Sequence, residues 1–220
     1  FTARSKQFQS LIDRYLAEGL VRPWQPRVLS PDPDKKPFKR EWFEPHYVAV
    51  PGMNGLAREL AQEQDVMLNT RVAAIEPNEG SWLLRDSEGE DLGRFDWVIS
   101  TLPAPQAQEL LPDCFTREGA FNEVDFSPCF SLMLGFDHTP ALNFDAAVVR
   151  NSPLGWIAVN ASKQDDPGAY ALVVHSDNEW ARTQLDSSLD EVRQKMLEAL
   201  DRLLGDALPQ PQHIEIHRWK

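Results

Sequence analysis

Tyr47-Val-Ala-Val-Pro-Gly-Met-Asn-Gly-Leu-Ala-Arg-Glu-Leu-Ala61, followed by Val66-Met-Leu-Asn-Thr-Arg-Val-Ala-Ala-Ile75, is the stretch that decides the fold. A Pro-Gly turn opens an amphipathic segment, and the hydrophobic period then changes from that of a helix to the period of two that is typical of strands. The first part therefore predicts a short helix, whose buried residues we expect to be Met53, Leu56, Ala57 and Leu60.

Downstream of this helix the pattern predicts a small sheet of hairpins, because Gly80 and Gly89 punctuate alternating segments. The run 97–103 is apolar and β-branched, as in a strand that is buried on both faces, and its prolines end it. The predicted strands are 66–68, 71–77, 81–85 and 96–101.

Upstream, apolar residues at helical spacing predict a helix over 8–16 that ends near Gly19. Seven prolines between residues 23 and 51 exclude a long helix there and favour an extended connection.

The second half reads as strands followed by a helix. Residues 129–136 alternate, with Phe130, Leu132, Leu134 and Phe136 on one face. Ser188 and Glu191 form a capping-box pattern that opens a helix ending near Gly205. Further strands are predicted at 146–150, 155–160, 169–175 and 213–219, with antiparallel pairing as the simplest arrangement.

Composition narrows the class of protein. With 42% hydrophobic and 25% charged residues the chain is ordinary for a globular protein, and its net charge of -12 argues against nonspecific nucleic-acid binding. No apolar run reaches the roughly 18 residues of a membrane span. Cys114 and Cys129 lie far apart, with no Cys-x-x-Cys motif and no His at metal-ligand spacing, so we expect two buried or idle thiols, no metal site and a cytoplasmic protein.

A possible site lies on one predicted hairpin. Trp156, Ala158 and Asn160 share a face of one strand, and Ala171, Val173 and His175 share a face of the next. If the two strands pair, Asn160 and His175 can lie near each other at one rim of the sheet. An amide and a neutral imidazole there could hydrogen-bond a planar heterocycle, although a lone His at a strand end is more often structural.

The order of these motifs resembles an interior piece of a bacterial renalase-like flavoprotein, within the group of FAD-dependent amine-oxidase-like oxidoreductases. The resemblance is carried by short stretches spread over nearly the whole chain, which are 1–4, 50–56, 70–72, 100–106, 156–163, 175 with 179–180, and 217–219. It implies an α/β (α+β) class in which part of a FAD/NAD(P)-binding Rossmann-like domain adjoins an antiparallel-sheet substrate domain. The implied boundaries are 1–46 for a substrate-domain helix and Pro-rich connection, 47–105 for part of the FAD-binding domain, and 106–220 for the substrate domain.

The resemblance also implies the chemistry. Such proteins oxidise dihydronicotinamide dinucleotides that are reduced at the 2- or 6-position, passing a hydride to non-covalent FAD, which dioxygen reoxidises with release of H2O2. By motif position, the catalytic residues would be Asn160 and His175. The cofactor contacts would be Val72, Arg4 and Pro103, and Trp156 and Trp42 would lie near the substrate.

Two other functions are also consistent with these motifs. The same scaffold suits an FAD-dependent amine oxidase, and a non-catalytic nucleotide-binding module is a third possibility. The chain has no Gly-x-Gly-x-x-Gly turn for a dinucleotide pyrophosphate, so we expect polypeptide missing at its start, and also at its end. Most of the FAD site would then lie outside these residues. We expect no membrane or nucleic-acid partner, and the oligomeric state is left open.

Overall fold

The computed structural model describes residues 1–40, 44–112, 114–115, 121, 123–138, 140–163 and 170–219. Their contacts divide the chain into two compact units. Unit 1 comprises residues 1–63 and 127–220, and unit 2 comprises residues 64–126.

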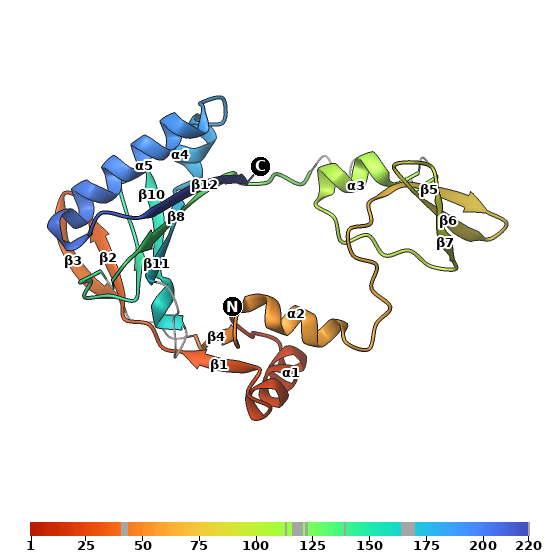
Figure 1. Ribbon diagram of the computed structural model, residues 1–220, viewed down its shortest axis with the longest axis horizontal. Coiled ribbons are helices and arrows are strands. Elements are labelled where there is room, and N and C mark those ends of the chain that lie inside the picture. Colours follow the sequence, from red (N-terminus) through yellow and green to blue (C-terminus); the bar gives the residue numbers. More distant parts are fainter. Residues whose placement is uncertain are drawn as a thin grey trace. The chain divides into compact units, whose positions relative to one another are not determined.

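A seven-stranded sheet forms the body of unit 1, in the order β12-β8-β11-β10-β9-β2-β3 (Figure 1). All neighbours pair antiparallel except β2 and β9, which are parallel. The proline of β3 sits on an edge strand, where a missing N–H donor is tolerated. The strands are β2 (Val28–Asp32), β3 (Lys35–Arg40), β8 (Cys129–Phe136), β9 (Ala146–Val148), β10 (Leu154–Val159), β11 (Tyr170–Ser176) and β12 (His213–Trp219).

One face of this sheet packs against α5 (Leu189–Leu204), which runs along it in Figure 1. The predicted alternation of β8 is confirmed, because Phe130, Leu132, Leu134 and Phe136 are all buried in this core. The predicted capping box is confirmed as well, with Ser188 and Glu191 bonding each other's backbone N–H. Val192, Met196 and Leu200 supply the buried stripe of the helix.

The N-terminal part of unit 1 has its own small core. Helix α1 (Lys6–Ala17) packs Ile12 and Tyr15 against the two-stranded sheet of β1 (Val21–Trp24) and β4 (His46–Ala49). Helix α2 (Met53–Ala61) forms as predicted, but only its Leu56 joins this core. The expectation that α2 buries Met53, Ala57 and Leu60 is wrong: all three are exposed, with 54% of the surface of Met53 and 52% of that of Leu60 accessible.

Unit 2 holds a three-stranded antiparallel sheet and α3 (Ala104–Leu110). Its strands are β5 (Val72–Asn78), β6 (Ser81–Asp86) and β7 (Asp91–Phe95). The sequence did not reveal β7, and the strands predicted at 66–68 and 96–101 do not form among the described residues. Trp97 and Ile99 are 87% and 85% exposed, because the apolar run that contains them pairs with no described strand.

The contacts divide the chain differently from the predicted boundaries at 47 and 106. Strand β4 pairs with β1, and Leu56 of α2 packs on the α1 core, so this segment groups with unit 1. Two short 3-10 helices, η1 (Asn160–Lys163) and η2 (Gly205–Ala207), and α4 (Asn178–Thr183) complete the elements. Among the described helices, none combines the length and the apolar character that a membrane crossing requires.

Candidate functional site

The second face of the seven-stranded sheet, opposite α5, gathers the candidate residues. We define this second face by the side chains that alternate with the buried core, namely Ser131, Met133, Trp156, Ala158, Val173 and His175. Met133, Trp156, Val173 and His175 are only partly buried. The face therefore combines apolar area with accessible polar atoms.

His175 lies directly opposite Trp156 in the β10–β11 ladder. The same register continues across the sheet, because His175 also faces Ser131 of β8, and Ser131 faces His217 of β12. One row of side chains thus places an indole, an imidazole and a hydroxyl side by side. Directly opposite residues have Cβ atoms about 4.5–5.5 Å apart, so neighbours in this row can contact the same ligand.

Trp219 closes the β12 end of the row. Its indole Nε1 donates a hydrogen bond to Ser131 Oγ at 3.0 Å, and its ring lies edge-on to His217 with the centroids 4.3 Å apart. These contacts bury Ser131, which is only 7% exposed. The Ser131 hydroxyl is therefore held in a fixed position beside His175.

The predicted hairpin is confirmed, but its register separates Asn160 from His175. Asn160 begins η1 after the last residue of β10, whereas His175 is opposite Trp156. Four residues of extended chain correspond to roughly 13 Å at about 3.3 Å per residue. The expectation that the two side chains meet at one rim is thus corrected: His175 has Trp156 as its neighbour, and Asn160 lies at the other end of the strand.

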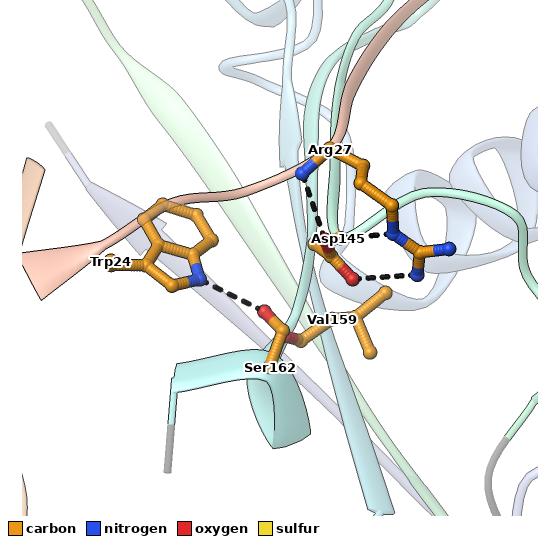
Figure 2. Close-up of polar contacts among 5 residues, drawn as sticks. All are labelled: Trp24, Arg27, Asp145, Val159 and Ser162. Atoms are coloured by element: carbon orange, nitrogen blue, oxygen red, sulfur yellow. Dashed lines mark hydrogen bonds and ion pairs between the residues drawn. The ribbon is translucent and has the colours of Figure 1, made fainter.

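The short helix η1 is fixed from the N-terminal side of the chain. Trp24 Nε1 donates to Ser162 Oγ at 3.1 Å, as Figure 2 shows, and Ser162 Oγ donates to the Val159 carbonyl at 2.7 Å. Arg22 Nε donates to the Lys163 carbonyl at 3.1 Å. Strand β1, about 140 residues earlier in the chain, therefore holds the turn that carries Lys163.

A second set of hydrogen bonds fixes the connection between β1 and β2. Arg27 donates to the Asp145 carboxylate from its backbone N (2.8 Å), its Nε (3.0 Å) and one terminal guanidinium nitrogen (2.8 Å), as Figure 2 shows. These bonds lower the pKa of Asp145, the side-chain bond from Arg27 being the main cause. Hydrogen bonds thus fix both ends of one short segment, Trp24 to Ser162 of η1 and Arg27 to Asp145, which directly precedes β9.

The electrostatics keep His175 neutral. Burial lowers the pKa of His175, and the positive charge of Lys163 lowers it further. Burial also lowers the pKa of Lys163 itself, whose ammonium lies 5.5 Å from the centroid of the Trp24 ring. At neutral pH the second face therefore offers His175 as an uncharged donor and acceptor.

Unit 2 carries a separate groove of about 1160 Å³, which Val72 lines together with Thr70, Arg71, Ser100 and Thr101. The hydroxyl oxygen of Ser100 is buried and has no hydrogen-bond partner among the described residues. Ser100 also lines a neighbouring cavity of about 570 Å³. An unsatisfied hydroxyl beside a groove of this size is suited to a polar ligand.

The remaining predicted residues have different surroundings. Pro103 is the N-cap residue of α3 in unit 2. Arg4, in unit 1, is exposed and forms an ion pair with Glu44 at 3.0 Å. Trp42 lies outside the described residues. No group of three or more His, Cys, Asp or Glu residues suited to a metal ion occurs in the part of the chain that the structure describes.

Sequence reasoning missed Ser131, Trp219 and Trp24. The alternation of β8 held the signal for Ser131, because a polar residue between buried apolar ones must face the other side of the sheet. Trp219 stands two residues beyond His217 and shares its face by the same rule. No local pattern could reveal Trp24, since its partner is 138 residues away.

Comparisons with known proteins find a matching family, a related sequence and similar structures. The family described as flavin containing amine oxidoreductase matches residues 26–220. Renalase from Mus musculus is 22% identical over 227 residues, covering 97% of this chain and 64% of renalase. Two solved structures each match 79% of this chain. One is wild-type putrescine oxidase bound to putrescine (TM-score 0.59, 17% identity), and the other is cyclohexylamine oxidase from Brevibacterium oxydans IH-35A (TM-score 0.62, 12% identity).

This chain spans 39% and 40% of those two structures and less than two thirds of renalase. At these identities the two structures establish the fold. They confirm the predicted α/β (α+β) class.

Proposed function

The chain belongs to the flavin containing amine oxidoreductase family, and from that premise we propose that the full-length protein is an FAD-dependent oxidase. We propose as its substrates dihydronicotinamide dinucleotides that are reduced at the 2- or 6-position. The observation that carries this proposal is the row on the second face in which the neutral His175 stands beside Trp156.

The residues of unit 2 fit the cofactor. Buried hydroxyl groups are normally hydrogen-bonded, so the unsatisfied Ser100 hydroxyl calls for a polar partner at the groove that Val72 lines. The adenosine portion of FAD offers such partners, and Val72 and Pro103 are our candidate contacts. FAD, when bound, supplies the redox chemistry by accepting a hydride and returning the electrons to dioxygen, which gives H2O2.

The second face suits a neutral, electron-rich ring. Trp156, which is partly exposed on this face, provides an aromatic surface. His175 can hydrogen-bond a ring carboxamide without adding charge. Removing a hydride from a dihydropyridine ring needs no general base, so a site whose role is to bind and orient the ring is chemically sufficient.

The positions of the carboxylates support this substrate over an amine. On the second face, the residues of β8, β9, β10 and β11 include no Asp or Glu. Glu215 stands on the edge strand β12, where it is exposed and lies 3.6 Å from His213. A substrate ammonium would thus find no buried counter-charge beside His175 and Trp156 among the described residues.

Anaerobic flavin reduction tests the proposal. Full-length protein carrying FAD is mixed in a stopped-flow instrument with 2- or 6-dihydronicotinamide dinucleotide, or with putrescine or benzylamine as amine substrates. We expect the dihydronicotinamide isomers to bleach the flavin absorbance, the amines to leave it unchanged, and air to restore it with production of H2O2. Reduction by the amines alone would identify an amine oxidase, and failure of the full-length protein to bind FAD would favour a non-catalytic module.

A further inference from the structure

Lys163 is a cation without a carboxylate partner among the residues that the structure describes. Its ammonium lies 5.5 Å from the centre of the Trp24 ring, and its side chain is partly buried. Lysine side chains usually extend into water, where their charge is solvated. Here the charge is held against an indole instead, so part of its hydration is lost.

The backbone around Lys163 is built to hold this position. Trp24 contributes both the ring beneath the ammonium and the N–H that bonds Ser162. Arg22 Nε donates a hydrogen bond to the Lys163 carbonyl, and Ser162 Oγ donates to the carbonyl of Val159 at the end of β10. Three side-chain hydrogen bonds therefore fix the short helix η1. A lysine on an unconstrained surface turn would need none of them.

The ammonium also belongs electrostatically to the second face. Its charge acts on His175, which lowers the pKa of that imidazole. Helix η1 directly continues β10, the strand that carries Trp156 and Ala158. A ligand that covers Trp156 and His175 and extends along β10 therefore approaches a partly desolvated positive charge.

We propose that Lys163 is the anion-binding residue of the substrate site and contacts a phosphate group of the dinucleotide. This inference rests on the proposed function, because it assigns the phosphate-bearing part of the same substrate. A phosphate restores to the ammonium the charge-assisted hydrogen bonds that partial burial has removed. The same charge repels protonated amines and so favours an anionic substrate over a cationic one.

Binding of NAD+ tests the inference without requiring turnover. Isothermal titration calorimetry with the full-length FAD-loaded protein compares wild type, Lys163→Met, Lys163→Arg and Lys195→Met. Lys195 is an exposed lysine of α5 that bonds Gln184, so its substitution controls for the loss of one positive charge. We expect Lys163→Met to weaken NAD+ binding about 10- to 100-fold, in line with a lost charge-assisted hydrogen bond, and Lys163→Arg to retain most of the affinity.

A phosphate-free ligand separates charge recognition from general damage to the site. Binding of N-methylnicotinamide should be the same in wild type and Lys163→Met, because it presents the ring without phosphate. Equal weakening of both ligands, or unchanged NAD+ binding in Lys163→Met, would overturn the inference. If Lys163→Met does not fold, Lys163→Gln takes its place under the same criteria.

The two proposals fail in different ways. Lys163-dependent NAD+ binding in a protein whose flavin is not reduced by the dihydronicotinamide isomers would support the anion site and reject the proposed reaction. Reduction by those isomers with an affinity that does not depend on Lys163 would support the reaction and reject the anion site.

Discussion

His175 of β11 and Trp156 of β10 are directly opposite each other on the second face of the sheet. Backbone hydrogen bonds of the two strands fix this relationship, so the imidazole and the indole are positioned before any ligand binds. Preorganised contacts of this kind reduce the entropy that binding must overcome.

Replacing His175 tests its role toward the substrate. Because His175 belongs to unit 1, whereas the groove that we assign to FAD is formed by residues of unit 2, His175→Ala should slow flavin reduction about tenfold while the FAD content stays unchanged. Stopped-flow reduction and the absorbance ratio of flavin to protein provide the two measurements. His213→Ala, on the exposed edge strand, is the matched control.

Asn160→Ala should have a smaller effect than His175→Ala, since Asn160 lies at the far end of β10 from Trp156. Loss of FAD with unchanged turnover per remaining flavin, in either variant, would contradict the assignment of these residues to the substrate site.

Removing the positive charge of Lys163 should change the pKa of His175 measurably. Lys163→Met removes a cation that lowers the pKa of His175, so the pKa should rise toward its ordinary value of about 6.5. It should stay below that value, because burial, the larger cause, remains. NMR titration of the imidazole protons measures the shift, and Lys195→Met should leave it unchanged. An unchanged pKa in Lys163→Met would show that the ammonium does not act on His175.

Local patterns in the sequence were sufficient for much of unit 1. The alternation of Phe130 and its neighbours and the capping box at Ser188 are short-range signals, and both are confirmed. Unit 2 was harder, because the apolar run around Trp97 has the composition of a buried strand but pairs with no strand among the residues described there. Propensity describes a residue's preference, whereas pairing depends on which partner is present.

The candidate site was also only partly predictable from the sequence. The hairpin of β10 and β11 was predictable from its sequence, but its register was not, and the register decides that His175 meets Trp156 rather than Asn160. The contact between Trp24 and Ser162 links residues 138 positions apart, so it follows only from the tertiary fold.

The capping box of α5 should contribute measurably to stability. Ser188→Ala removes the acceptor of the Glu191 N–H, which should cost about 1 kcal/mol of unfolding free energy. Urea unfolding followed by circular dichroism measures the loss. Ser10→Ala, at an exposed position within α1, should change stability by less than about 0.5 kcal/mol. Equal losses of unfolding free energy in the two variants would mean that Ser188 stabilises the protein no more than an exposed serine within a helix does.

The pair of Arg27 and Asp145 should make stability depend on acid pH. The pKa of Asp145 is lower in the folded protein than its ordinary value of 3.8, chiefly through the side-chain bond from Arg27. Its contribution is therefore complete above pH 3.8 and is lost as the pH falls through the folded pKa. Asp145→Asn should lower the unfolding free energy by about 1 kcal/mol at neutral pH, a value reduced for the exposure of Arg27.

Urea midpoints of wild type and Asp145→Asn should converge as the pH is lowered below this range, because the wild-type carboxylate then becomes protonated. Glu18→Gln, in an exposed i,i+4 pair with Arg14, serves as the control and should leave the pH dependence of the wild type intact. Parallel curves for wild type and Asp145→Asn at every pH would contradict the role of this carboxylate.

Trp24 should affect ligand binding through Lys163 in two separable ways. Trp24→Phe keeps an aromatic ring beneath the ammonium but removes the N–H donated to Ser162, whereas Trp24→Leu removes both. Because a cation–π contact is worth about 0.5–2 kcal/mol, Trp24→Leu should weaken NAD+ binding roughly two- to thirtyfold, and Trp24→Phe should weaken it less. Calorimetry on the FAD-loaded full-length protein measures both affinities.

Ser162→Ala breaks the same hydrogen bond as Trp24→Phe, so the double variant should bind NAD+ no more weakly than the poorer single variant. Additive losses would show that Trp24 and Ser162 act independently and that the indole N–H does not position Lys163.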